Sequence, residues 1–136
     1  MNDIHKIIEK RFNNTNKLIF LATSHDNVPY VRAMTPYYNQ GAFYFISHIH
    51  SSKIAQIHSN HLVALCGEWF NAQGIAYVYP FQSLDSHLKG KIKEYTKSWI
   101  ALGNVDLNNA DTCVIKVELT QGYIYENNIR YDIKQK

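Results

Sequence analysis

Short apolar segments separated by turn residues constrain the fold of this chain more than any other feature. In residues 29–37, Val31 and Ala33 alternate with Arg32 and Met34, which is the period of two that a strand requires. Comparable strand-like segments cover residues 18–24, 42–47, 62–69, 73–79 and 112–119, and a terminal hairpin is expected over residues 122–133. Six or seven strands with hairpin connections and flanking helices predict a mainly β, mostly antiparallel barrel.

The strand at residues 29–37 carries a proline near each end. Pro29 and Pro36 lack the backbone N–H that a central strand donates to its neighbours. We therefore expect this strand to end at these prolines or to lie at an edge of the sheet.

Three segments follow the period of a helix instead of a strand. Asn2 or Asp3 is expected to cap a first helix, whose apolar stripe comprises Ile4, Ile7, Ile8 and Phe12. Residues 52–58 predict a short second helix. Ser83 is expected to cap a longer third helix, whose stripe comprises Leu84, Leu88, Ile92, Tyr95, Trp99 and Leu102.

Composition restricts the class of protein. A hydrophobic fraction of 46% over 136 residues predicts one globular domain spanning residues 1–136. The net charge of +3 is mild, and the densest basic run, at Lys89, Lys91, Lys93 and Lys97, is expected to be a solvated helix face. We therefore expect no nucleic-acid partner.

The cysteines and the apolar runs bear on location. Cys66 and Cys113 lie in apolar segments and are expected to be buried free thiols, unlike the cysteines of a secreted disulfide scaffold. No signal-peptide core occurs in residues 1–12, and no apolar run approaches the roughly 20 residues that span a bilayer. A cytoplasmic protein without a membrane partner is the expectation.

The stretch from Val31 to Lys53 points to an anionic ligand. It carries Arg32 near its start and Lys53 at its end, with hydroxyl groups between them at Thr35, Ser47, Ser51 and Ser52. If the strands on either side of residues 39–41 pair, these groups converge beside the N-terminus of the second helix. Cations, hydroxyls and free helix N–H groups together suit a dianionic phosphate.

Two segments carry a family resemblance. LATSHDNVPYVRAMTPYY, followed by AFYFISHIHSSKIAQIHSNHLVAL, resembles the pyridoxamine 5′-phosphate oxidase-like FMN-binding split-barrel family, in particular its short members that are like general stress proteins. The resemblance runs from about residue 18 to residue 65. It implies a split barrel that binds FMN at a homodimer interface. The positions that it assigns to the flavin are Arg32, Ala33, Met34, Thr35, Ile46, Ser47, Ser52 and Lys53.

This sequence departs from the full pyridoxamine phosphate oxidases at several positions. It has Tyr37 where those enzymes place a substrate-binding lysine, and Ser52 where they often have arginine. It stops at Lys136 without their basic C-terminal motif. We therefore do not expect vitamin B6 oxidation.

The resemblance leaves the activity open. An FMN-dependent oxidoreductase with an unknown substrate is the first hypothesis, although no side chain can be assigned as a catalytic acid or base. The alternatives are a flavin-binding sensor or carrier without turnover and a haem-handling relative of the same fold. The last is suggested by the histidines at positions 48, 50, 58 and 61. Since these histidines have no acidic or thiolate partner at a recognised spacing, no metal site is predicted.

Overall fold

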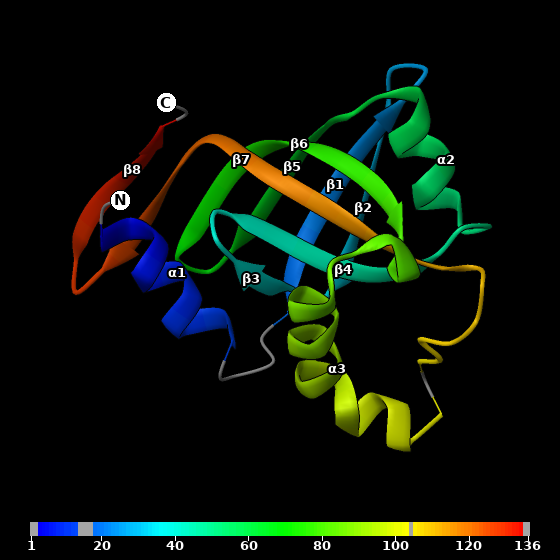
Figure 1. The fold of residues 1–136 in the computed structure, drawn as a ribbon. Coiled ribbons are helices and arrows are strands. Elements are labelled where there is room, and N and C mark those ends of the chain that lie inside the picture. Colours follow the sequence, from blue (N-terminus) through cyan, green and yellow to red (C-terminus); the bar gives the residue numbers. More distant parts are fainter. Residues whose placement is uncertain (1–2, 14–17, 104, 135–136) are drawn as a thin grey trace.

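Figure 1 shows a computed structural model of the chain, which describes residues 3–13, 18–103 and 105–134. The described helices are α1 (Asp3–Asn13), α2 (Ser52–Ser59) and α3 (Ser86–Ala101), with a 3-10 turn (Phe81–Ser83) before α3. The strands are β1 (Ile19–His25), β2 (Val28–Met34), β3 (Tyr37–Asn39), β4 (Ala42–His48), β5 (Leu62–Gly67), β6 (Phe70–Pro80), β7 (Thr112–Glu126) and β8 (Ile129–Lys134). The three helices and the terminal hairpin predicted from the sequence are confirmed.

The strands form one antiparallel sheet. Its hydrogen-bonded order is β2-β1-β5-β6-β7-β4-β3, and β8 pairs with β7 beside this path. The long strands β6 and β7 cross the middle of the sheet, and the curvature brings its two ends toward each other (Figure 1). The architecture is the predicted split barrel, mainly β with flanking helices.

One strand pairing differs from the sequence prediction. The pairing considered for the strand at residues 29–37 with residues 42–47 is wrong for all but Tyr37: β2 pairs with β1, while the separate strand β3 pairs with β4. The cause lies at Pro36, which has no N–H and restricts the backbone of Thr35, so that β2 ends at Met34. The expectation that β2 is an edge strand is confirmed, because it stands at one end of the sheet order.

Three hairpins turn through two residues that both have positive φ. This is the backbone of the turn that matches the twist of antiparallel strands, and asparagine, aspartate and glycine tolerate it best. The pairs are Asp26 and Asn27 (52° and 64°), Gln40 and Gly41 (48° and 89°), and Asn127 and Asn128 (52° and 65°). These turns fix the registers of β1 with β2, β3 with β4 and β7 with β8.

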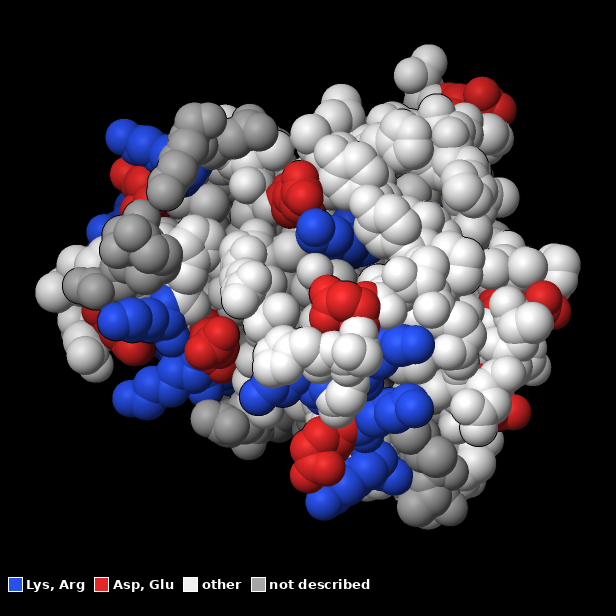
Figure 2. All heavy atoms as spheres, viewed as in Figure 1, with Lys and Arg blue, Asp and Glu red and all other residues white. Residues whose placement is uncertain are grey.

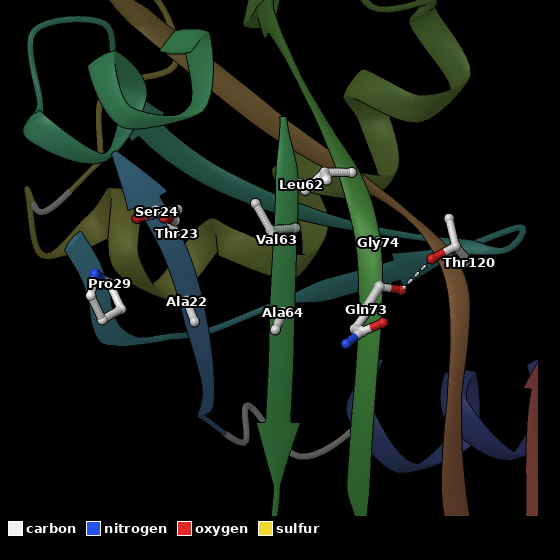
Figure 3. Close-up of a pocket in the computed structure, with 10 residues that line it drawn as sticks. All are labelled: Ala22, Thr23, Ser24, Pro29, Leu62, Val63, Ala64, Gln73, Gly74 and Thr120. Carbon is white, nitrogen blue, oxygen red and sulfur yellow. Dashed lines mark hydrogen bonds between the residues drawn. The ribbon is translucent and has the colours of Figure 1, made fainter. Parts of the chain in front are cut away.

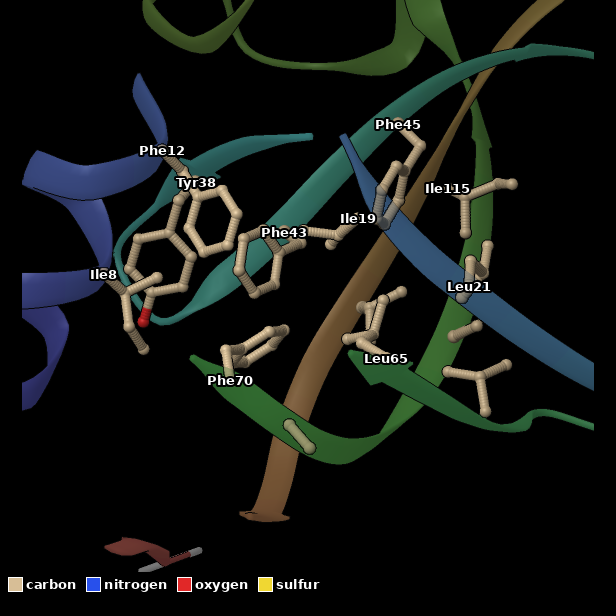
Figure 4. Packing of buried hydrophobic residues seen from close by; sticks show 14 of the residues in the cluster. Ile8, Phe12, Ile19, Leu21, Tyr38, Phe43, Phe45, Leu65, Phe70 and Ile115 are labelled. Atoms are coloured by element: carbon tan, nitrogen blue, oxygen red, sulfur yellow. The ribbon is translucent and has the colours of Figure 1, made fainter. Parts of the chain in front are cut away.

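The largest apolar cluster fills the barrel and contains a group of aromatic rings (Figure 4). Phe43 lies among them, with its ring centroid 5.1 Å from that of Phe12, 4.9 Å from Tyr38 and 5.6 Å from Phe70. The predicted stripe of α1 covers this core, with Ile4, Ile8 and Phe12 buried. The barrel interior is thus a packed core, and a ligand has to bind at its margin.

The cysteines are both free thiols. Cys113 is buried, as expected. Cys66 is only half-buried, so the prediction that it is buried is wrong. Cys66 lies opposite the exposed Phe20 in the ladder of β1 and β5, so it shares the outward face of the sheet.

A second, smaller apolar cluster lies between α3 and the sheet. Leu88 and Ile92 of α3 are buried in it together with Tyr44 and Val114. The predicted stripe is therefore confirmed at its centre, while the side chain of Trp99 lies outside the described residues. The stripe residue Leu102 is 75% exposed and does not join the cluster.

The predicted cap of α3 is wrong. The hydroxyl of Ser83 donates to the carbonyl oxygen of Pro80 (2.7 Å) within the 3-10 turn. Asp85 caps the helix instead, because its Oδ1 accepts a hydrogen bond from the N–H of Leu88 (2.8 Å). A carboxylate at this place also interacts favourably with the helix dipole.

Removing this cap is expected to destabilise the protein measurably. Asp85→Ala should lower the free energy of unfolding by about 1 kcal/mol, because one N–H group of the first turn loses its acceptor. Ser83→Ala is the matched control and should change it by less than about 0.5 kcal/mol. Urea titrations of both variants at one protein concentration provide the measurement. Equal effects would mean that Asp85 is not the cap.

The surface carries charges of both signs. On the face seen in Figure 2, lysine and arginine side chains are interspersed with aspartate and glutamate. On α3, Lys97 pairs with Glu94 (3.1 Å), Lys91 and Lys93 are exposed, and Lys89 is half-buried, so the predicted solvated helix face is confirmed for all but Lys89. Among the described residues, no helix has the length and apolarity that crossing a lipid bilayer would require.

Candidate functional site

A cavity of about 430 Å³ brings together most of the positions that the sequence assigns to a flavin. It lies where the end of β2, the strand β4, the start of α2 and the segment before β7 meet. Its lining comprises Arg32, Ala33, Met34, Thr35, Ile46, Lys53 and Val105. Six of the eight predicted positions are in this lining, and Ser47 and Ser52 are not. We call it the Arg32–Lys53 cavity.

The cavity lies between the two ends of the sheet order. Arg32 comes from β2, the first strand of the order, whereas Ile46 comes from β4, which is next to the last. Thr35 belongs to the short connection that carries the chain from β2 to β3. The predicted convergence is therefore correct, but barrel curvature produces it and not a hairpin between these strands.

Arg32 is held by neutral acceptors. Its Nη1 donates to the carbonyl oxygen of Leu21 (3.2 Å) and to Oγ1 of Thr23 (3.0 Å), and its Nη2 donates to Oε1 of Gln56 (2.8 Å). Partial burial lowers the pKa of Arg32. Since arginine remains protonated even so, the guanidinium brings a full positive charge to the cavity.

Lys53 adds a second cation to the same cavity. Its Nζ lies 3.4 Å from Oγ of Ser47. Burial lowers the pKa of Lys53, the charge of Arg32 lowers it further, and Cys113 acts weakly in the opposite direction. Within the described residues no carboxylate forms an ion pair with Arg32 or Lys53. Two neighbouring cations without a counter-ion make an anion the complementary ligand.

The serines stand at the beginning of α2. Oγ of Ser47 lies 3.2 Å from Oγ of Ser51, which is the N-cap residue of the helix and makes no side-chain cap bond. The first N–H groups of a helix have no partner within it, so this end also favours an anion. Ser52 begins the helix with an exposed side chain, whereas the side chain of Ser51 is half-buried.

Three residues of the site were missed by sequence reasoning. Thr23 and Gln56 are buried polar side chains that hold Arg32, and Val105 lines the cavity. A signal for Thr23 did exist, because strand alternation places it on the same face as Ile19 and Leu21. Val105 had no signal, since it lies in a loop that reaches the cavity only in the folded chain.

The histidines do not form one cluster. Nε2 of His48 and Nε2 of His50 lie 3.8 Å and 3.5 Å from Oδ2 of Asp111, next to the start of α2. His58 is exposed, and Nδ1 of His61 lies 3.2 Å from the carbonyl oxygen of Ala76. Over the described ranges, no group of three or more histidine, cysteine or acidic side chains is arranged to hold a metal ion.

A second cavity of about 370 Å³ lies over the sheet (Figure 3). Figure 3 shows side chains from β1, β2, β5 and β6 around it, and the hydroxyl of Thr120 donates to the carbonyl oxygen of Gln73 at its rim. Its lining comprises Ala22, Thr23, Ser24, Pro29, Leu62, Val63, Ala64, Gln73, Gly74 and Thr120. Small and apolar residues dominate this lining, and none of the described residues in it carries a positive charge.

Exposed apolar side chains surround this second cavity. Ala22 pairs with both Val31 and Ala64, so these residues lie on one face of the sheet, and Phe20 and Leu62 lie two positions away on the same face. Val31 is 66% exposed and Leu62 is 67% exposed. We call this surface the β1–β2–β5 face.

Comparison with solved structures identifies the fold. General stress protein 26 from Bacillus anthracis superposes with a TM-score of 0.72 at 17% identity, covering 98% of this chain and 100% of that one. A FAD-binding protein from Mesorhizobium loti gives 0.63 at 16% identity, covering 85% and 90%. A pyridoxamine 5′-phosphate oxidase-related, FMN-binding protein from Nostoc punctiforme gives 0.57 at 15% identity, covering 97% and 93%.

These similarities confirm the resemblance at the level of the fold. The chain has the split-barrel fold shared by general stress protein 26 and the pyridoxamine 5′-phosphate oxidase-related FMN-binding proteins. A scan against protein-family models finds no match, and a search of curated proteins finds none either.

Proposed function

We propose that this protein binds FMN in the Arg32–Lys53 cavity and uses it as an oxidoreductase. The observation that carries the proposal is the convergence of Arg32 and Lys53 beside the N-terminus of α2, where no carboxylate of the described part of the chain pairs with either cation. Two of the structural neighbours are named for binding FMN or FAD, which supports a flavin over other phosphorylated ligands.

The residues of the cavity fit the two parts of FMN. Its polar end offers two cations to a phosphate, and the hydroxyl groups of Ser47 and Ser51 lie next to Lys53 outside the lining. Its other walls, at Ala33, Met34, Ile46 and Val105, offer apolar contact to a ring system. A bound flavin would supply hydride or electron transfer, while the protein binds it, orients it and excludes water.

The absorption spectrum of the purified protein tests the proposal most directly. We expect flavin absorption, release of FMN identified by mass, and loss of the colour when NAD(P)H is added. FMN that no reductant bleaches would identify a flavin-binding sensor or carrier without turnover. A colourless protein that does not bind added FMN would contradict the proposal itself.

We also propose that the protein forms a homodimer through the β1–β2–β5 face. Its exposed apolar side chains lie on three adjacent strands around the second cavity, and a second copy of this chain offers a complementary surface. Val31→Asp together with Leu62→Asp should therefore produce a monomer in sedimentation velocity. Val28→Asp is the control, because Val28 is also exposed but lies on the opposite face of β2. A wild-type monomer at micromolar concentration would contradict the dimer.

The affinity for FMN is expected to fall at alkaline pH. A bound phosphate stabilises the charged form of Lys53, so binding weakens as pH rises through the pKa of Lys53 in the free protein, which lies below 10.5. The dissociation constant for FMN should therefore increase over an alkaline range of pH that begins below the ordinary lysine pKa, because burial lowers the pKa of Lys53. Riboflavin is the control ligand, since it shares the ring ionisation of FMN but has no phosphate. Lys53→Met should remove the difference between the two ligands in this range, and an unchanged difference would exclude Lys53.

A further inference from the structure

Gln56 and Thr23 are buried polar side chains that face the same cation. Gln56 is 8% exposed on α2, and Thr23 is 2% exposed on β1. Oγ1 of Thr23 donates to Oε1 of Gln56 (2.6 Å), and each of these atoms also accepts a hydrogen bond from Arg32, at 3.0 Å and 2.8 Å. The three side chains therefore close a triangle of hydrogen bonds that joins β1, β2 and α2.

The triangle fixes which edge of the guanidinium remains free. Oγ1 of Thr23 and Oε1 of Gln56 are 2.6 Å apart and accept hydrogen bonds from Nη1 and Nη2, respectively. These two oxygen atoms therefore lie at the edge of the guanidinium that Nη1 and Nη2 form. The other N–H of Nη1 serves the carbonyl oxygen of Leu21. The N–H of Nε and the second N–H of Nη2 have no acceptor among the described residues, and two such parallel donors form the edge of a guanidinium that binds phosphate oxygens in a bidentate manner.

The triangle also leaves the charge of Arg32 unneutralised. Gln56 and Thr23 contribute only neutral oxygen atoms, and the third acceptor is a backbone carbonyl. A carboxylate at the position of the Gln56 amide would hold the same edge but cancel most of the charge that attracts a dianion. Buried arginines are commonly held by such carboxylates, so the neutral amide is a specific property of this site.

We propose that Gln56 is a positioning residue that makes the site selective for a flavin with a phosphomonoester over a flavin without one. It holds Arg32 by one edge, presents the other edge to the phosphate, and preserves the positive charge. Thr23 orients Oε1 of Gln56 by donating to it. This inference rests on the proposed function, because it concerns how the same cavity recognises FMN.

Gln56→Glu tests the inference because it keeps the size and the acceptor oxygen and adds one negative charge. We expect the affinity for FMN to fall by about tenfold or more, with little change in the affinity for riboflavin, since only the phosphate contact weakens. Gln40→Glu is the matched control, with the same chemical change at the exposed β3–β4 turn. The ratio of the two affinities is the readout, because a general disturbance of the fold would weaken both ligands alike.

A second pair of variants covers the case in which Gln56→Glu does not fold. Thr23→Val removes the hydroxyl that orients Gln56 and should reduce the preference for FMN several-fold. Thr23→Ser keeps a hydroxyl at this position and should retain the preference of the wild type. If the wild-type protein shows no preference for FMN over riboflavin, the proposed function fails. If the wild type prefers FMN and the Gln56 and Thr23 variants keep that preference unchanged, the positioning role fails alone.

Discussion

Replacement of both Arg32 and Lys53 by alanine is expected to weaken FMN binding by about 10²- to 10⁴-fold. Each side chain would contribute a charge-assisted hydrogen bond to the phosphate, and each such bond contributes about 1.5 to 3 kcal/mol. The variant should therefore be purified without flavin and should require high concentrations of added FMN. Isothermal titration with FMN and with riboflavin would measure the loss, which should be much smaller for riboflavin.

The control for this double variant removes two lysines from a different surface. Lys6→Ala with Lys10→Ala changes the net charge equally, but both side chains are exposed on α1 and do not line the cavity. At physiological ionic strength charges beyond about 8 Å are largely screened, so this control should bind FMN as the wild type does. Stoichiometric FMN in the purified Arg32 and Lys53 variant would show that the phosphate lies elsewhere.

The largest loss of stability is expected for Phe43→Ala. The ring is fully buried and packs against Phe12, Tyr38 and Phe70, so its removal leaves a cavity inside the barrel. Such a change typically lowers the free energy of unfolding by about 3 to 5 kcal/mol. In a urea titration the midpoint should fall while the slope remains the same.

Leu102→Ala provides the comparison, since this side chain is 75% exposed and should contribute less than about 0.5 kcal/mol. Both variants have to be measured at one protein concentration, because association of two copies would add to the apparent stability. If Phe43→Ala cost no more than Leu102→Ala, the aromatic cluster would not be the centre of the core.

Local patterns in the sequence were sufficient for most of the elements, but they did not determine how distant strands pair. The alternation around Arg32 correctly predicts β2, and Pro36 correctly marks an edge strand. The partner of β2 was predicted wrongly because period-two alternation says which face a residue occupies and nothing about the neighbouring strand. The residues between β2 and β4 also form a short strand of their own, β3. A strand of three residues is too short for an alternating pattern to be recognised in the sequence.

The two cations of the cavity were predicted from their own chemistry and its neutral lining through the family resemblance, whereas the buried polar residues that hold Arg32 were missed. Arg32 and Lys53 were identified because cations near a helix N-terminus have an evident ligand. Thr23 and Gln56 were missed because an isolated threonine or glutamine in an apolar segment has many uses. Their role depends on contacts between β1, β2 and α2, which only the folded chain creates.

The position of the cavity between the two ends of the sheet order has a mechanical consequence. β2 pairs only with β1 among the described strands, so no backbone ladder connects it to β4 across the cavity. A ligand that contacts Arg32 and Ile46 together would join these two strands, at a place where no backbone hydrogen bonds of the described strands link them. Binding of the ligand and closure of the barrel between β2 and β4 would then be thermodynamically coupled.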